Sequence, residues 1–267
     1  MFDLSVLPDE ITSITAGLKW TCDDIGMSDS TILLYEEGMA LKIEKTSRSS
    51  KHEIMLLSWL DGLLPAPKII KTVTRGGYSF LLMTRLSGEM ACSDNGMRNI
   101  EDTVKALATG IKMLWKIDIS NCPCVNSISQ KLIQAKNNID NNLVDINNFN
   151  PETFTVEGFK DVPDLYDYLC RHRPVEDLVF SHGDYCLPNV FISGSDVTGF
   201  LDWGNGGVAD RWQDIALCVR SLRLNYVQLA GFSDMDYEKS KTLLFRELNL
   251  EPDYEKIRYF ILLDELF

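Results

Sequence analysis

The chain has 267 residues, of which 45% are hydrophobic, which is enough to bury a core in one large domain or in two lobes. Its formal net charge of −13 would repel a phosphate backbone and argues against a nucleic-acid partner. No apolar run approaches the length of a membrane-spanning helix, and the first ten residues lack the basic start of a signal peptide. The seven cysteines have no paired spacing, which favours reduced thiols. We therefore expect a cytoplasmic protein without a membrane partner.

The first part of the chain has the pattern of short strands. Residues 31–35 and 39–43 are rich in Ile, Leu and Tyr and are separated by Glu36-Glu37-Gly38, which predicts a hairpin. Residues 52–60 carry apolar side chains at helical spacing, and a Pro-containing segment ends that helix. Residues 68–73 and 78–83 predict two more strands, joined by a turn at residues 75–77.

The pattern changes after Ser87-Gly88. Residues 100–117 and 165–171 predict helices, and the Asn-rich stretch at 137–150 between them predicts a helix end and a loop. A strand-rich front and a helix-rich back indicate two lobes. We place the boundary so that residues 1–86 form the first lobe and residues 87–267 the second.

The most informative segment carries oxygen ligands between apolar strands. His182-Gly183-Asp184 is followed five residues after the aspartate by Asn189, and a second apolar run leads to Asp202-Trp203-Gly204. Phosphoryl transfer needs a carboxylate at the attacking hydroxyl and hard oxygen ligands for Mg²⁺. Asp184 fits the first role, and Asn189 and Asp202 fit the second. The alternative is a structural turn with a capped strand end, but the combined spacing is far more specific than a lone His-Gly-Asp.

This pattern resembles the aminoglycoside phosphotransferase family. His182-Gly183-Asp184 with Asn189 is similar to the family's catalytic loop, and Asp202-Trp203-Gly204 resembles the counterpart of the protein-kinase Asp-Phe-Gly. The resemblance implies an α+β, bilobal protein-kinase-like fold with a small strand-rich N-lobe and a larger helical C-lobe. It also implies that Asp214, in a segment similar to the family's A-D-R-x-Q-D, supports the catalytic loop through hydrogen bonds, although an ordinary helix-start carboxylate is nearly as good an interpretation.

The resemblance extends upstream to the nucleotide site. Lys42 resembles the strand lysine that binds the α- and β-phosphates, and Glu53 stands where its partner glutamate is expected. Ser28 lies in the place of the nucleotide-positioning loop, without the full glycine pattern of protein kinases. The Thr84 carbonyl and the Leu86 amide match the hinge that reads the adenine edge. These residues imply ATP, or GTP, as the cosubstrate with Mg²⁺.

The last residues, 262–267, closely resemble the end of the 3′-aminoglycoside phosphotransferases, the kanamycin kinases. In that subfamily the tail closes the antibiotic pocket and its carboxylates face ammonium groups, which implies that Asp264, Glu265 and Phe267 contact the substrate. We group Arg220 with them as a substrate-binding residue. The resemblance therefore implies transfer of the γ-phosphate to the 3′-hydroxyl of aminoglycosides such as kanamycin or neomycin, which inactivates the antibiotic.

Three departures from the family pattern limit this interpretation. Asn205 stands where relatives typically carry an arginine, and Ala40 replaces an aromatic ring that stacks on adenine in some relatives. The acidic substrate loop is echoed only loosely, around Glu152 and Glu157, with Leu224 near where another acid is expected. The alternatives are a kinase of another small alcohol, such as choline, homoserine or a macrolide, and a nucleotide-binding pseudokinase. The sequence leaves the oligomeric state open.

Overall fold

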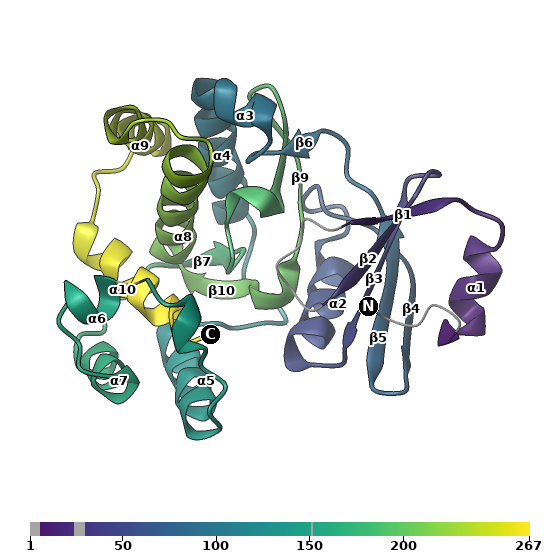
Figure 1. The fold of residues 1–267 in the computed structure, drawn as a ribbon, viewed down its shortest axis with the longest axis horizontal. Coiled ribbons are helices and arrows are strands. Elements are labelled where there is room, and N and C mark those ends of the chain that lie inside the picture. Colours follow the sequence, from purple (N-terminus) through teal and green to yellow (C-terminus); the bar gives the residue numbers. More distant parts are fainter. Residues whose placement is uncertain (1–5, 24–29, 151) are drawn as a thin grey trace.

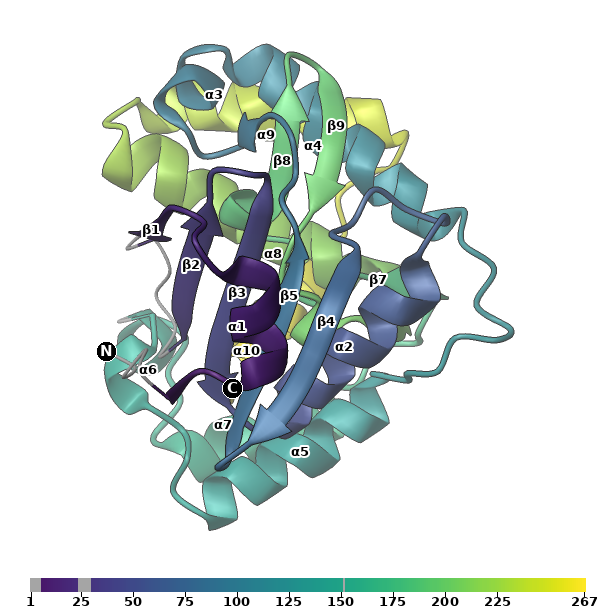
Figure 2. The same ribbon diagram turned by 90° about the vertical axis from the view of Figure 1, so that its right-hand side faces the viewer.

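We analysed a computed structural model, which describes residues 6–23, 30–150 and 152–267. Figure 1 shows a strand-rich part at one end of the molecule and a larger helical part at the other, and Figure 2 views the strand-rich part from its own end. This arrangement confirms the predicted α+β, bilobal protein-kinase-like fold. None of the helices in the described ranges combines the length and apolarity that a bilayer crossing requires.

The N-terminal part is a five-stranded antiparallel sheet in the order β1-β2-β3-β5-β4. The two predicted hairpins are confirmed, with their turns where the Gly-containing segments stand. Helix α1 lies on one face of the sheet (Figure 2), and α2 follows β3. The elements are α1 (Asp9–Thr15), β1 (Trp20–Asp23), β2 (Thr31–Tyr35), β3 (Met39–Lys45), α2 (Arg48–Leu60), β4 (Ile69–Arg75) and β5 (Tyr78–Thr84).

Alternation along β3 and β5 gives the sheet two different faces. Leu41 and Ile43 belong to the apolar cluster that also contains Ile11 of α1. Successive side chains of a strand point to opposite faces, so Ala40 and Lys42 project to the other side. Ala40 there joins the main core, which continues into the helical part. The strand pattern therefore turns Lys42 away from α1 and toward α2.

Helix α2 begins at Arg48, four residues earlier than the sequence pattern predicted. Ser47 caps it, since its hydroxyl accepts a hydrogen bond from the backbone N–H of Ser50 and the Ser50 hydroxyl accepts one from the Ser47 N–H. Short polar side chains hid this start, because an apolar-spacing argument detects only the later turns. The buried face of the helix carries Glu53 together with three leucines: Leu56, Leu57 and Leu60.

The helical part contains two small sheets, one of three strands and one of two. Strand β6 pairs with β8, β8 pairs with β9, and β7 pairs with β10. Its regular elements are β6 (Glu89–Met90), α3 (Asp94–Arg98), α4 (Ile100–Trp115), α5 (Ile128–Asp140), α6 (Glu152–Thr155), α7 (Val162–Arg171), β7 (Leu178–Ser181), β8 (Val190–Ser193), β9 (Asp196–Phe200), β10 (Gly207–Asp210), α8 (Arg211–Arg223), α9 (Asp234–Leu248) and α10 (Tyr254–Asp264). Short 3₁₀ turns at Leu187–Asn189 and Trp203–Asn205 contain Asn189 and the residues after Asp202, and a π-helical turn follows α8 at Leu224–Leu229.

The predicted helices at 100–117 and 165–171 correspond to α4 and α7, and the loop in the Asn-rich stretch begins where α5 ends at Asp140. Strand β5 ends at Thr84, and the next strand, β6, pairs with β8 of the helical part. The exact division into residues 1–86 and 87–267 stays a prediction.

Candidate active site

A buried carboxylate holds the predicted catalytic loop in place through hydrogen bonds. Asp214, fully buried near the start of α8, accepts a hydrogen bond at Oδ2 from the His182 N–H (2.8 Å) and at Oδ1 from the Gly183 N–H (2.9 Å) and the Ser181 hydroxyl (3.0 Å). Burial raises the pKa of Asp214, and these donors, with His182, act against that rise. The predicted support of the loop by Asp214 through hydrogen bonds is therefore confirmed.

Gln213 adds a contact that the sequence reasoning missed. Its side-chain amide donates to the Gly183 carbonyl at 3.2 Å, so two adjacent residues of α8 hold the same turn of the loop. The glutamine belongs to the A-D-R-x-Q-D segment and could have been found there. The sequence alone does not single it out, because an uncharged amide at the start of a helix has no catalytic or metal-binding pattern of its own.

Gly183 allows the catalytic loop to lie directly against the segment after Asp202. Its φ is +83°, in the left-handed region, and a Cβ atom at this position would lie 1.8 Å from the backbone oxygen of Asn205. Only glycine satisfies both conditions without displacement. The glycine of the motif is thus explained by close packing between the two loops.

We expect Gly183→Ala to lower the free energy of unfolding by about 2–3 kcal/mol, because the new methyl group forces the two loops apart. For a chain of this size the melting temperature should fall by about 5–10 °C in a thermal melt. Gly194→Ala is the matched control, since Gly194 also has a positive φ, +59°, but open space around it. Equal losses for both variants would show that backbone strain alone, and not the close approach, requires the glycine.

His182 links the two loops through both ring nitrogens. Nε2–H donates to the Leu201 carbonyl at 2.8 Å, and Nδ1 accepts a hydrogen bond from the Asp184 backbone N–H at 3.3 Å. The ring is fully buried and lies 4.5 Å from the Trp203 ring, between their centroids. The histidine therefore fixes Asp184 relative to the strand end that leads into Asp202, and it has no free nitrogen for proton transfer.

Asp184 and Asn189 lie together at the mouth of the loop. The Asn189 side-chain nitrogen donates both to the Asp184 carbonyl and to its carboxylate oxygen Oδ2, each at 3.0 Å. This orientation uses the nitrogen and leaves the amide oxygen of Asn189 available for a cation. Asp184 is partly exposed, so its carboxylate can reach a substrate.

Asp202 follows β9 in a left-handed conformation, with φ 59°. A non-glycine residue in this region is uncommon and strained, and such residues gather at functional sites. The side chain is 47% exposed, and its Oδ1 accepts a hydrogen bond from Lys42 Nζ at 3.3 Å. The structure thus brings Asp202 from the helical part and Lys42 from the sheet to one place.

Lys42 is held at the centre of three carboxylates. Its Nζ lies 2.8 Å from Glu53 Oε2, 3.3 Å from Asp202 Oδ1 and 3.7 Å from Glu44 Oε1. Burial favours a lower pKa for Lys42, but the charges of Glu53, Asp202 and Glu44 outweigh burial and raise its pKa. Burial also raises the pKa of Glu53, to about 6, although Lys42 opposes the rise. At neutral pH the pair is therefore ionised.

The remaining residues predicted to bind the nucleotide lie at or after the end of β5 or outside the described residues. Thr84 ends β5 opposite Met39 of β3, and its hydroxyl accepts a hydrogen bond from the Lys68 N–H at 2.9 Å. Leu86 packs against Gly199 of β9, where a Cβ would meet its side chain at 2.5 Å. Ser28 falls outside the described ranges, and its proposed contact with phosphate stays a prediction, as does adenine reading at Thr84 and Leu86.

The last helix brings its acidic end close to the catalytic loop's helix α8. Arg220 donates to Asp264 Oδ2 at 2.6 Å, which ties the end of α10 to α8. Glu265 accepts a hydrogen bond from the Asn150 N–H through both oxygens, at 3.1 and 3.2 Å, and burial raises its pKa. The Phe267 ring lies under Lys131 of α5, with Nζ 5.0 Å from the ring centroid.

These contacts change how Arg220 can act. Its guanidinium is already paired with a carboxylate, so the structure supports a role in orienting Asp264 rather than in direct contact with a cationic substrate. Of the weaker acidic candidates, Glu157 forms an ion pair with Arg258 at 2.6 Å, and Leu224 is 42% exposed on the π-helical turn. Glu152 opens the short helix α6.

Comparison with known proteins identifies the family. Residues 24–237 match the model of the phosphotransferase enzyme family (APH). The chain belongs to this family. This phosphotransferase is 37% identical over 261 residues to an aminoglycoside 3′-phosphotransferase of Enterococcus faecalis, with 93% of this chain and 94% of the relative covered. It is 41% identical over 225 residues to an aminoglycoside 3′-phosphotransferase of Campylobacter jejuni, with 84% and 83% covered.

Solved structures agree with the fold of this phosphotransferase. Aminoglycoside phosphotransferase APH(3″)-Id from Streptomyces rimosus, in complex with ADP and streptomycin, superposes with a TM-score of 0.80 at 19% identity, covering 100% of this chain and 99% of that one. At this identity the likeness concerns the fold. The family match and the relatives above confirm the resemblance inferred from the His-Gly-Asp and Asp-Trp-Gly motifs.

Proposed function

We propose that this phosphotransferase moves the γ-phosphate of ATP to the 3′-hydroxyl of aminoglycoside antibiotics and so inactivates them. The observation that carries the proposal is the convergence of Lys42, Asp184, Asn189 and Asp202, which come from both lobes and supply the groups that phosphoryl transfer needs. The names of the two 3′-phosphotransferase relatives support the choice of substrate and position. We further propose that the protein acts in the cytoplasm, where ATP is available.

The residues fit a magnesium ion. Asn189 directs an amide oxygen outward because its nitrogen is engaged by Asp184, and Asp202 offers a half-exposed carboxylate. Mg²⁺ favours one or two protein oxygens together with substrate phosphates over a closed protein cage. When bound, Mg²⁺ would neutralise developing charge on the phosphates.

The protein residues then have separate tasks. Lys42, oriented by Glu53, binds the phosphate chain of the nucleotide, and Asp184 orients the substrate hydroxyl and receives its proton. His182 and Asp214 keep Asp184 in place through the backbone. Asp264 and Glu265 face the ammonium groups of the antibiotic, and the net charge of −13 favours the approach of a polycation.

Mg²⁺-dependent nucleotide turnover with kanamycin tests the proposal. ATP and GTP are supplied in parallel, because Ala40 lies where some relatives stack an aromatic ring on adenine. The control is an aminoglycoside that lacks the 3′-hydroxyl. Turnover with kanamycin and none with the control is the expected result. Nucleotide binding without turnover of any amino sugar would instead favour the pseudokinase, and turnover of choline, homoserine or a macrolide would favour a different alcohol kinase.

We expect Lys42→Met to reduce kcat/KM for ATP by roughly 100-fold, because the cation that binds the phosphate chain is removed from a buried site. Glu53→Gln should cost less, since the amide can still contact Lys42 but no longer neutralises it. Steady-state kinetics with varied ATP measure both effects. Lys45→Met is the control, since Lys45 ends the same strand and is exposed. A comparable loss in Lys45→Met would mean that net charge and not position matters.

A further inference from the structure

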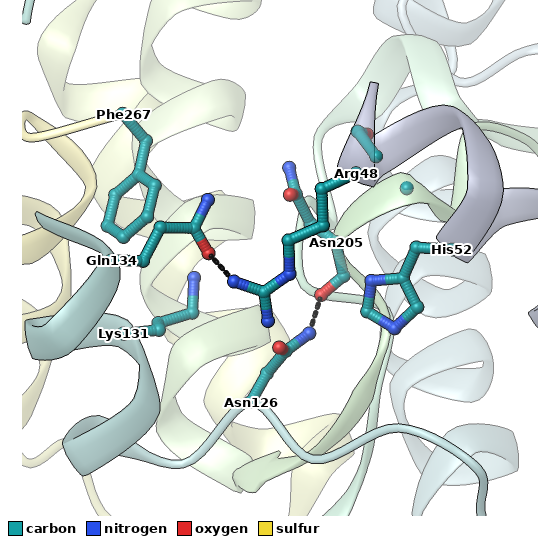
Figure 3. Close-up of a pocket in the computed structure, with 9 residues that line it drawn as sticks. Arg48, His52, Asn126, Lys131, Gln134, Asn205 and Phe267 are labelled. Atoms are coloured by element: carbon teal, nitrogen blue, oxygen red, sulfur yellow. Dashed lines mark hydrogen bonds between the residues drawn. The ribbon is translucent and has the colours of Figure 1, made fainter. Parts of the chain in front are cut away.

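A pocket beside the active site is lined by cations and amides (Figure 3). Arg48 and His52 of α2 form one side, and Lys131 and Gln134 of α5 form the other. The full lining is Arg48, Ser49, His52, Asn126, Lys131, Gln134, Gly204, Asn205 and Phe267. No Asp or Glu side chain is among these residues, although acidic residues outnumber basic ones by 39 to 26 in the whole chain. The pocket therefore suits an anion.

Most hydrogen-bond donors of the Arg48 side chain are unused. Its Nη1 donates to the Gln134 side-chain oxygen at 2.9 Å, which bridges α2 and α5. A guanidinium carries five N–H groups, and within the described ranges this is the one hydrogen bond that Arg48 makes. Figure 3 shows the guanidinium directed into the space between Gln134 and Asn126. The other donors are available to a ligand.

Lys131 is a half-buried cation without a partner of opposite charge. Among the residues that the structure describes, its Nζ makes neither a hydrogen bond nor an ion pair, and it lies over the Phe267 ring. Burial lowers the pKa of Lys131, and the negative charges of Asp264, Asp214 and Asp184 act in the opposite direction. None of these three carboxylates forms an ion pair with Nζ among the described residues, so an anion in the pocket would be its first direct partner.

The pocket adjoins both loops that carry the chemistry. Gly204 and Asn205, which form one wall, are the second and third residues after the proposed metal ligand Asp202. The backbone oxygen of Asn205 packs over Gly183, the residue before Asp184, and also accepts a hydrogen bond from the Asn126 side chain at 2.8 Å. The Asn126–Asn205 contact is the second dashed line in Figure 3. The cations are therefore held beside the site of transfer.

Size and charge restrict the ligand. The pocket volume is about 30 Å³. That is room for roughly two water-sized groups. An aminoglycoside is also a polycation, which Arg48 and Lys131 repel. Phosphate oxygens are small and anionic, and arginine binds them with directed hydrogen bonds.

We propose that Arg48 and Lys131 bind the oxygens of the phosphoryl group in transfer and supply the positive charge that Asn205, in the same pocket, does not. This inference rests on the proposed function. As the bond from phosphorus to the 3′-oxygen forms, the bond to the oxygen shared with the β-phosphate breaks, ADP leaves, and the hydroxyl proton passes to Asp184. The non-bridging oxygens keep their negative charge throughout, and the two cations stabilise it.

Binding measurements without turnover test the first part. Arg48→Ala and Lys131→Ala should each weaken a non-hydrolysable ATP analogue about tenfold in calorimetry while leaving ADP affinity within about twofold, since ADP lacks the γ-phosphate. Lys136→Ala, which removes an exposed lysine of the same helix that pairs with Asp140, is the control and should change neither affinity. Equal weakening of ADP and the analogue, or no weakening of either, would overturn the proposal.

Charge replacement tests the second part. Arg48→Ala should lower kcat with kanamycin by about 10- to 100-fold, as the loss of one preorganised donor does elsewhere. Adding Asn205→Arg to this variant should recover at least half of the loss on a logarithmic scale, whereas Asn205→Arg alone should change kcat little. No recovery in a double variant that melts normally would overturn the proposal. The Arg48→Ala variant can also be tested for inhibition by phosphorylated kanamycin. If this inhibition is weaker than in the wild type while binding of the ATP analogue is unchanged, the cations contact the product, which contradicts a contact with the γ-phosphate.

A failure of the cation-pocket proposal can be distinguished from a failure of the proposed function. Wild-type turnover of kanamycin tests the reaction, and the variants test only how charge is supplied to it. A wild-type protein that turns over kanamycin while Arg48→Ala and Lys131→Ala behave like the wild type would leave the reaction established and the cation pocket without a role.

Discussion

Replacing Asp184 with alanine should lower kcat with kanamycin on the order of 10³–10⁴-fold and leave the affinity for ADP within about twofold of the wild-type value. The reason is that Asp184 is the carboxylate at the open end of the catalytic loop, whereas the lysine that meets the nucleotide, Lys42, lies on the other side of the site. Coupled detection of ADP release gives kcat, and calorimetry gives the nucleotide affinity.

Two outcomes would contradict this assignment. One is residual turnover close to wild type, which would leave proton acceptance to another group. The other is loss of nucleotide binding at unchanged turnover per bound nucleotide, which would make Asp184 a nucleotide ligand. Asp196→Ala is the matched control, because Asp196 is an exposed carboxylate at the start of the neighbouring strand β9.

The second large effect is expected at Asp214, and it concerns stability. Asp214→Ala removes the acceptor of three hydrogen bonds and leaves the donors of Ser181, His182 and Gly183 buried and unpaired. Each unpaired buried donor costs about 1–3 kcal/mol, and relief of the buried charge offsets part of the sum, so we expect a loss of about 3–5 kcal/mol in the free energy of unfolding. Urea unfolding followed by fluorescence measures it.

The catalytic loop should also lose its geometry in this variant, so kcat should fall at temperatures where the protein remains folded. Asp214→Asn keeps one oxygen acceptor but places an N–H₂ group against a backbone donor, and it should recover only part of the stability. Asp234→Ala is the control, since its contact with Arg223 is on the surface and worth less than about 1 kcal/mol. Similar losses at positions 214 and 234 would refute the structural role.

Local patterns predicted the parts of the fold that depend on neighbours in sequence. The hairpins of the sheet have Gly-containing turns between apolar runs, and both were found from those signals. The catalytic segment was found for a related reason: Asp184, Asn189 and Asp202 lie within one short stretch, so their spacing alone indicates a shared site. Hydrogen bonding by Asp214 was anticipated through the family motif and not through spacing.

The missed features depend on contacts between distant segments. Strand β10 pairs with β7, 25 or more residues away in sequence, and no local pattern encodes that partner. Helix α5 has a Ser127 cap and apolar residues at helical spacing: Ile128, Leu132 and Ala135. The sequence analysis predicted only the Asn-rich end of this helix and the loop after it. Arg48 and Lys131 are ordinary surface-type residues in the sequence. Only the packing of α2 beside α5 brings them to one pocket.

The hydrogen bonds to Asp214 have a consequence for motion. The backbone amides of His182 and Gly183 belong to a loop at the active site, yet both are buried and bonded to a side chain in the core. They should exchange with deuterium as slowly as the amides of the central helices, because exchange of either amide requires its buried hydrogen bond to Asp214 to break. The segment that carries the chemistry is then part of the most protected unit of the protein. Variation that widens the range of antibiotics must be accommodated elsewhere, in the segments around α6 and the end of α10, where contacts can change without loosening the catalytic aspartate.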